Sequence, residues 1–149
     1  MKVRKAVGAI VTIGEDYVLI LKTKIHTTEG KKEIEGEWDF IKGGVEEEDS
    51  SLEEAILREL EEETGMKAFL VKKEFEEKIS FKFPQEVADK IGYHSQVTTM
   101  FLVEYRGENK DWLPQDDEVS EIGFFKKEVV LRKLAHEETR KYFKKHCLN

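Results

Sequence analysis

The sequence has little of what marks several common protein classes. It has a single cysteine, Cys147, so no internal disulfide can form, and the reducing cytoplasm is the expected compartment. No apolar run reaches the length of about 18 residues that a transmembrane helix needs, so we expect no membrane partner. Basic residues are outnumbered, with 25 Lys and Arg against 32 Asp and Glu. The resulting net charge of -7 argues against stable nucleic-acid binding and suits a protein that concentrates divalent cations.

Two hydrolase motifs and all signs of internal repetition are also missing. The stretch HEETR at residues 136–140 lacks the second histidine of a zinc protease motif, and no G-x-S-x-G supports a serine hydrolase. The chain contains no repeat, linker or low-complexity tract. We therefore expect residues 1–149 to form one domain.

Hydrophobic patterning indicates both strands and helices. The apolar runs at residues 6–13 and 17–23 flank a turn at Gly14 and predict a β-hairpin. Residues 24–37 are polar and contain two glycines, and we interpret them as a long loop. Further strands are expected within residues 67–83, 96–105 and 121–125, and helices at about 52–64, 126–135 and 137–146. Strands and helices mixed along one short chain predict an α/β sandwich.

The helix expected at residues 52–64 has marked ends and a marked buried side. Ser50 and Ser51 each have a glutamate three residues later, which is the capping-box spacing. Gly65 can adopt the left-handed conformation that ends a helix. At about 100° per residue, the apolar side chains gather on one stripe. That stripe consists of Leu52, Ala55, Ile56 and Leu60.

Three glutamates of this helix fall on or beside the apolar stripe. Glu63 lies near its middle, Glu59 lies close beside it, and Glu62 lies at its edge, whereas Glu61 points to solvent. Carboxylates about 4 Å apart repel each other by roughly 4 kcal/mol at an effective dielectric near 20, and partial burial adds a desolvation cost. Proteins tolerate such clusters by raising a pKa or by placing a cation among the oxygens. Oxygen ligands in a group favour Mg²⁺ or Mn²⁺.

The same stretch resembles the signature of the Nudix hydrolases. Their box is a glycine, five residues, a glutamate, seven residues, and then Arg-Glu-aliphatic-x-Glu-Glu-x-Gly-aliphatic. Residues 44–66, GVEEEDSSLEEAILRELEEETGM, keep this spacing from Gly44 to Met66. The resemblance implies a Nudix-type α/β/α sandwich with a mixed central sheet, and a MutT-like pyrophosphohydrolase. One position departs: Ser50 stands where the box has its first glutamate, and Asp49 stands where glycine is common.

The resemblance also implies the site and its cofactor. A Nudix hydrolase cleaves a nucleoside diphosphate linked to another group and requires Mg²⁺ or Mn²⁺. Glu62 and Glu63 would be metal ligands, and Glu59 would bind metal or act as the base that deprotonates the attacking water. Arg58 would orient Glu59, and the carbonyl oxygen of Gly43 would be a further ligand. The departure at Ser50 bears on the number of metals and on the rate.

Similarity carries over less directly to the substrate. Nudix enzymes often use one more acidic residue outside the box, for which Glu104, Glu108 and Glu118 are the candidates. Lys42 is a candidate phosphate contact, and Trp38 is a candidate for stacking on a base. Phe81, Phe83 and Tyr93 also qualify for stacking, although the strand spacing of the two phenylalanines favours a place in the core.

Three functions remain open. The leading one is hydrolysis of a small nucleotide, either a dinucleoside polyphosphate or a nucleoside triphosphate, because WDFIKG at residues 38–43 resembles the W-x-x-P-K-G of dinucleoside polyphosphate hydrolases. The second is removal of pyrophosphate from RNA 5′ ends, which the acidic composition does not favour. The third is a non-catalytic nucleotide sensor, which the retained box glutamates oppose. A homodimer is compatible with the sequence.

Overall fold

The computed structural model describes residues 2–27, 29–108 and 111–148. Within these ranges the chain forms eight strands and four helices. The strands are β1 (Val3–Ile13), β2 (Asp16–Thr27), β3 (Gly30–Asp39), β4 (Ile41–Gly44), β5 (Phe69–Glu74), β6 (Ile79–Lys82), β7 (Ser95–Tyr105) and β8 (Val119–Phe125). The helices are α1 (Leu52–Thr64), α2 (Gln85–Ile91), α3 (Lys127–Lys133) and α4 (Glu137–Cys147).

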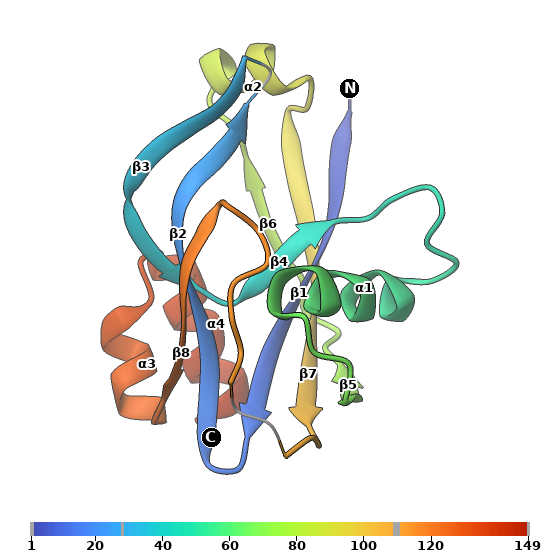
Figure 1. Cartoon of the computed structure of the whole chain (residues 1–149). Coiled ribbons are helices and arrows are strands. Elements are labelled where there is room, and N and C mark those ends of the chain that lie inside the picture. Colours follow the sequence, from blue (N-terminus) through green and yellow to red (C-terminus); the bar gives the residue numbers. More distant parts are fainter. Residues whose placement is uncertain (1, 28, 109–110, 149) are drawn as a thin grey trace.

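The strands form one mixed sheet between two helical layers. The main path of the sheet runs β3-β2-β1-β7-β5, while β4 pairs with β1, β6 with β7 and β8 with β2. β1 and β7 run parallel, and the other pairs are antiparallel. α1 lies on one side of the sheet, and α3 and α4 lie on the other (Figure 1). The predicted α/β/α sandwich with a mixed sheet is confirmed.

Strand β1 shows how the sheet builds a core on each face. Its side chains alternate between the two faces, as in any strand. Val11 packs in a buried cluster with Ile56 and Leu60 of α1. Ile10 packs in a second cluster with Phe143 of α4. The buried stretch from Ala6 to Val11 of β1 therefore contributes to the core on both faces of the sheet and helps to fix where α1 can lie.

The hairpin predicted at the start of the chain is confirmed, with Ile13 opposite Asp16 across the turn. The loop predicted for residues 24–37 is wrong, because this segment is the end of β2 and most of β3. β3 is an edge strand that is held by backbone hydrogen bonds to β2, so its polar side chains can remain in water. Helix α2 was not predicted; its side chains are at most half-buried, so it shows no apolar stripe.

Two further details concern residues outside the core. The core location favoured for Phe81 is wrong, because its exposed fraction is 36% and it packs edge-on against Phe83 at the end of β6. In the part of the chain that the structure describes, no helix has the length and apolar character needed to cross a membrane.

Candidate functional site

Helix α1 carries the box glutamates at graded depths. The side chain of Ser51 accepts a hydrogen bond from the Glu54 amide and begins the helix, and Gly65, at a φ of 75°, ends it. Along the helix Glu59 is buried, Glu63 is half-buried and Glu62 is exposed. The helical wheel correctly places Glu62 at the edge of the stripe, but Glu59, and not Glu63 as the wheel predicts, is the most deeply buried of the three. Two carboxylates therefore occupy positions at which an ordinary amphipathic helix has apolar side chains.

Strand β4 brings its glycines directly under this helix. A Cβ atom added to Gly43 would lie 2.0 Å from Cδ of Glu59, closer than any side chain allows. Only glycine at this position lets the carboxylate of Glu59 rest on the strand. The predicted metal ligands Gly43 and Glu59 are therefore adjacent in the structure, although they lie far apart in the sequence.

Arg58 connects the helix, the strand and the loop between them. Its Nη1 donates to Oε1 of Glu59 at 3.0 Å and to Oε2 of Glu62 at 3.2 Å. Its Nη2 donates to the carbonyl oxygen of Gly44 at 3.0 Å and to Oδ2 of Asp49 at 2.8 Å. The planar guanidinium thus uses several of its fixed donors at once, as expected for an arginine that sets the geometry of carboxylates.

Burial is the main reason that the pKa values of both Glu59 and Glu63 are raised. Burial raises the pKa of Glu59, and the hydrogen bond from Arg58 partly opposes this. Burial raises the pKa of Glu63 to about 8, with further contributions from the negative charges of Asp116 and Glu59. Oε2 of Glu63 is buried without a hydrogen-bond partner. A buried carboxylate oxygen with no partner, next to other carboxylates, is costly unless a cation or a proton compensates it.

The chemistry of these residues fits a divalent cation. Glu59, Glu62 and Glu63 offer oxygen donors on one side of a helix, beside the backbone of Gly43, and this is the donor set that Mg²⁺ and Mn²⁺ prefer. Among the described residues, no three acidic, histidine or cysteine side chains converge closely enough to hold a metal ion. Glu59 and Glu62 turn towards Arg58, so a cation would compete with the guanidinium for them.

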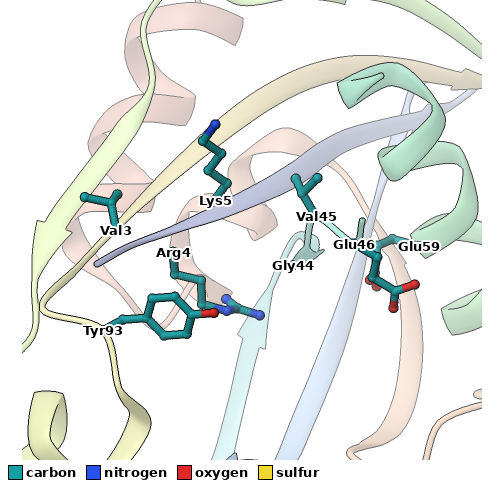
Figure 2. A pocket seen from close by; sticks show the side chains of 8 residues that line it. All are labelled: Val3, Arg4, Lys5, Gly44, Val45, Glu46, Glu59 and Tyr93. Atoms are coloured by element: carbon teal, nitrogen blue, oxygen red, sulfur yellow. The ribbon is translucent and has the colours of Figure 1, made fainter. Parts of the chain in front are cut away.

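A cavity of about 500 Å³ opens beside Glu59. Figure 2 shows the hydroxyl end of Tyr93 extending towards Arg4 at one end of this cavity, with Glu59 at the other end and Lys5 directed away from Arg4. Nη1 of Arg4 donates to Gln96 at 2.7 Å, which fixes the guanidinium. The residues that line the cavity are Val3, Arg4, Lys5, Gly44, Val45, Glu46, Glu59 and Tyr93. The cavity thus pairs a fixed cationic side chain with the carboxylate end of the site.

The two residues predicted to contact the substrate do not join this cluster. Nζ of Lys42 lies 3.3 Å from the carboxylate of Asp39 and 3.4 Å from the hydroxyl of Thr139 in α4. The ring of Trp38 packs edge-on against Phe125 and lies under Nζ of Lys133 in α3. Both side chains therefore face the α3–α4 layer, and their contact with a substrate stays a prediction.

One acidic residue outside the box that acts on a box glutamate was missed by the sequence analysis. Glu104 pairs with Arg106 at a second cavity lined by none of the box residues, and Glu108 is exposed. Glu118 pairs with Lys31 at 3.7 Å. It is Asp116 whose charge acts on Glu63, in a loop held against the end of α1 by the hydrogen bond from the Gln115 amide to the Glu63 carbonyl, at 3.3 Å. The acidic run at residues 116–118, just before β8, was the available signal.

The sequence and the fold are also similar to those of known proteins. The family model of the NUDIX domain matches residues 2–146. The RNA pyrophosphohydrolase of Nitratiruptor sp. is 30% identical over 127 residues, which cover 76% of this chain and 81% of that protein. A NUDIX hydrolase from Nitrosomonas europaea superposes with a TM-score of 0.71 at 15% identity, over 94% of this chain and 85% of that one. The C. elegans Ap4A hydrolase superposes with a TM-score of 0.70 at 14% identity, over 95% and 93% of the chains.

The chain belongs to the Nudix family. The resemblance read from residues 44–66 is therefore confirmed, and so is the prediction of a Nudix pyrophosphohydrolase.

Proposed function

We propose that this protein hydrolyses a pyrophosphate bond in the 5′-polyphosphate of a nucleotide with the help of Mg²⁺ or Mn²⁺, and that the 5′-triphosphate end of RNA is its first substrate. The observation that carries the proposal is the uncompensated carboxylate of Glu63 next to Glu59. Its oxygen Oε2 has no partner, and its pKa is raised to about 8. A cation among these carboxylates would give the oxygen of Glu63 a partner and would stabilise its ionised form. A pyrophosphate substrate requires the same cation.

The metal-binding residues in this proposal are Glu59, Glu62, Glu63 and the carbonyl oxygen of Gly43. A bound divalent cation supplies neutralisation of the phosphate charge and activation of a water molecule. The retained glutamates favour an enzyme over a nucleotide sensor, because a sensor would have no need to keep all three.

The protein's own side chains would accept the proton, orient the base and bind the phosphates. Glu59, whose buried carboxylate rests on Gly43, is positioned to accept a proton from the attacking water, and a raised pKa makes a carboxylate a stronger base. Arg58 holds Glu59 through its hydrogen bond at 3.0 Å. Arg4, at the far end of the cavity, would bind the phosphate chain that extends from the site of attack.

RNA is placed first because the sequence relatives are named as RNA pyrophosphohydrolases. The acidic composition argues against stable binding of a long RNA, but removal of pyrophosphate from a 5′ end requires only the terminal nucleotide and its phosphates to enter the site. Arg4 in the cavity offers a local positive charge for that end. Dinucleoside polyphosphates are the second candidate, since residues 38–43 resemble the lead-in of their hydrolases, with Ile41 in place of proline.

The test is a matched comparison of substrates. Purified protein with Mg²⁺ is given a short 5′-triphosphorylated RNA, diadenosine tetraphosphate and a set of nucleoside triphosphates at equal concentration, and the products are separated by chromatography. The proposal expects pyrophosphate and 5′-monophosphorylated RNA, with kcat/KM for RNA at least about tenfold above the other substrates. A preference for diadenosine tetraphosphate would establish the second candidate instead.

Variants of one helix separate chemistry from folding. Glu59→Gln and Glu63→Gln should each lower kcat by about 10²-fold or more, because each removes a donor to the cation or the base. Glu61→Gln is the matched control, since Glu61 lies on the exposed side of the same helix. Turnover that survives in both Glu59→Gln and Glu63→Gln would refute the assignment.

A further inference from the structure

The box departure at Ser50 has a counterpart in the structure. The family pattern has a glutamate at this position, but the hydroxyl of Ser50 bonds to the carboxylate of Glu54 within the first turn of α1. The residue before it, Asp49, points the other way and meets Arg58. The acidic side chain that the box lacks at position 50 is therefore present one residue earlier.

Asp49 holds Arg58 by two parallel hydrogen bonds. Nε of Arg58 donates to Oδ1 at 2.9 Å, and Nη2 donates to Oδ2 at 2.8 Å. Such bidentate pairs fix both the position and the plane of the guanidinium. The side chain of Asp49 is only 3% exposed, and that of Arg58 is 20% exposed. The hydrogen bond from the guanidinium lowers the pKa of Asp49 to about 2, so the carboxylate is ionised at neutral pH.

A tight turn in the loop fixes Asp49 in its place. The amide of Glu46 donates to Oδ2 of Asp49 at 2.8 Å, and the amide of Asp49 donates back to the carbonyl of Glu46 at 3.1 Å. The loop after β4 is thereby closed on itself, with the carboxylate of Asp49 turned inward. The carboxylate that Arg58 contacts is therefore held in place by hydrogen bonds within its own loop.

The orientation of Arg58 decides where its remaining donors point. With Nε and Nη2 on Asp49, the rigid fork directs Nη1 to Glu59, at 3.0 Å. The exposed carboxylates of Glu46 and Glu62, at 3.5 and 3.2 Å from Nη1, are competing partners. Without Asp49, Arg58 could turn towards these surface charges and leave Glu59 without its donor.

We propose that Asp49 is a positioning residue, which takes over the place of the missing box glutamate and holds Arg58 so that Arg58 orients Glu59. The role rests on the proposed function, because Glu59 is the carboxylate assigned to the reaction. It predicts an effect on kcat rather than on KM, since Asp49 lines no part of the cavity beside Glu59. It also predicts that the carboxylate can be moved to position 50.

The test compares removal of the carboxylate with its relocation. Asp49→Asn and Asp49→Ala each abolish the charged bidentate contact, and the double variant Asp49→Ala, Ser50→Glu returns an acidic group at the position used by the family. Glu47→Gln is the matched control, an exposed acid of the same loop. All variants are assayed with Mg²⁺ and 5′-triphosphorylated RNA, and their folding is checked by thermal unfolding.

Asp49→Asn should lower kcat by about 10–100-fold, the usual range for a residue that orients a ligand, and leave KM within about twofold. The double variant should recover kcat to within about fivefold of the wild type, and Glu47→Gln should match the wild type. The proposal is overturned if Asp49→Asn keeps the wild-type kcat. It is equally overturned if the double variant folds normally and is no more active than Asp49→Ala.

A measurement without substrate separates this proposal from the proposed function. The Nε–H signal of Arg58 in a ¹H–¹⁵N spectrum reports its hydrogen bond to a carboxylate. We expect the signal to be protected from solvent exchange in the wild type, to lose that protection in Asp49→Ala and to regain it in the double variant. Absence of turnover in the wild type would refute the proposed function, whereas an Arg58 signal unchanged in Asp49→Ala would refute the anchoring by Asp49.

Discussion

Replacing Glu63 by glutamine should make the cation-free protein more stable at alkaline pH. Glutamine has nearly the same shape as glutamate but carries no charge, and the carboxylate of Glu63 is half-buried with an unpartnered oxygen. Its pKa is raised from 4.5 to about 8, so the native protein holds this proton more tightly than the unfolded chain does. Ionisation of Glu63 therefore lowers the free energy of unfolding as the pH rises from about 4.5 to about 8.

The size of this difference in stability follows from the pKa shift of Glu63. At about 1.36 kcal/mol per pH unit, full conversion of the shift gives about 5 kcal/mol. Because water reaches this half-buried side chain, screening leaves about 2 kcal/mol of that figure. For a domain of this length, about 2 kcal/mol corresponds to about 4–8 °C in melting temperature. Above pH 8 Glu63→Gln should exceed the wild type by this amount, and below pH 4.5 the two should converge.

Thermal unfolding with EDTA and with Mg²⁺ tests both the sign of this stability difference and its cause. In EDTA at pH 8.5 the variant should melt at the higher temperature. Saturating Mg²⁺ should raise the melting temperature of the wild type, because a ligand that binds only the native state stabilises it. The variant should gain much less from Mg²⁺, because it has lost a donor.

Glu61→Gln, on the exposed side of the same helix, controls for the loss of one negative charge. It should change the melting temperature by less than about 2 °C, because its ion pair with Lys67 is a surface contact. A Glu63→Gln variant that is less stable than the wild type in EDTA at pH 8.5 would contradict the reasoning. It would mean that the carboxylate is compensated in the cation-free protein after all.

Two other substitutions probe the geometry of the site. Gly43→Ala should lower kcat by about 10²-fold, because its Cβ would meet the carboxylate of Glu59 at 2.0 Å; single-turnover kinetics on the folded variant measure this, and an unchanged rate would contradict the close approach. Arg4→Gln should raise KM about tenfold and change kcat little, because Arg4 lines the cavity away from the carboxylates. Lys5 also borders the cavity, but its side chain points away from Arg4 in Figure 2, so Lys5→Gln controls for the loss of one positive charge. Equal KM values in both variants would rule out a phosphate contact by Arg4.

Local signals in the sequence were sufficient to predict helix α1 and the side on which its glutamates lie. The caps at Ser51 and Gly65, and the placement of Glu59 and Glu63 deeper than Glu62, follow from residue type and helical period alone, because a helix is closed by its own hydrogen bonds. The first hairpin was equally readable, since its two apolar runs flank a short turn. Helix α1 carries most of the box, so the centre of the candidate site was predictable.

Features that depend on partners distant in sequence were not predictable. Residues 24–37 resemble a loop because β3 draws its stability from the backbone of β2 and not from apolar side chains. Asp116 reaches Glu63 only because the loop before β8 folds against the end of α1. The direction of Lys42 follows from the register in which β4 pairs with β1, opposite Gly8, and the sequence does not specify that register.

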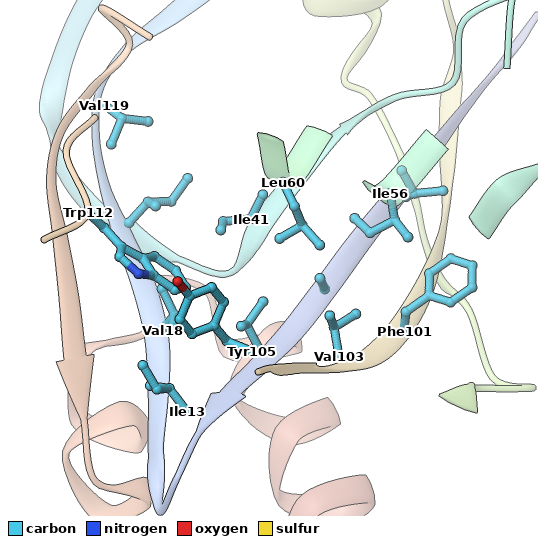
Figure 3. Packing of buried hydrophobic residues seen from close by; sticks show 14 of the residues in the cluster. Ile13, Val18, Ile41, Ile56, Leu60, Phe101, Val103, Tyr105, Trp112 and Val119 are labelled. Atoms are coloured by element: carbon cyan, nitrogen blue, oxygen red, sulfur yellow. The ribbon is translucent and has the colours of Figure 1, made fainter. Parts of the chain in front are cut away.

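The parallel pairing of β1 with β7 has a consequence for the order in which the protein can assemble. It joins Arg4 to Gln96, 92 positions later, so the two central strands cannot meet until two thirds of the polypeptide has left the ribosome. Phe101 and Val103 of β7 supply part of the surface on which Ile56 and Leu60 of α1 rest (Figure 3). We therefore expect the glutamate-bearing helix to be synthesised early but seated late, and nascent chains that end before β7 to remain open to proteolysis.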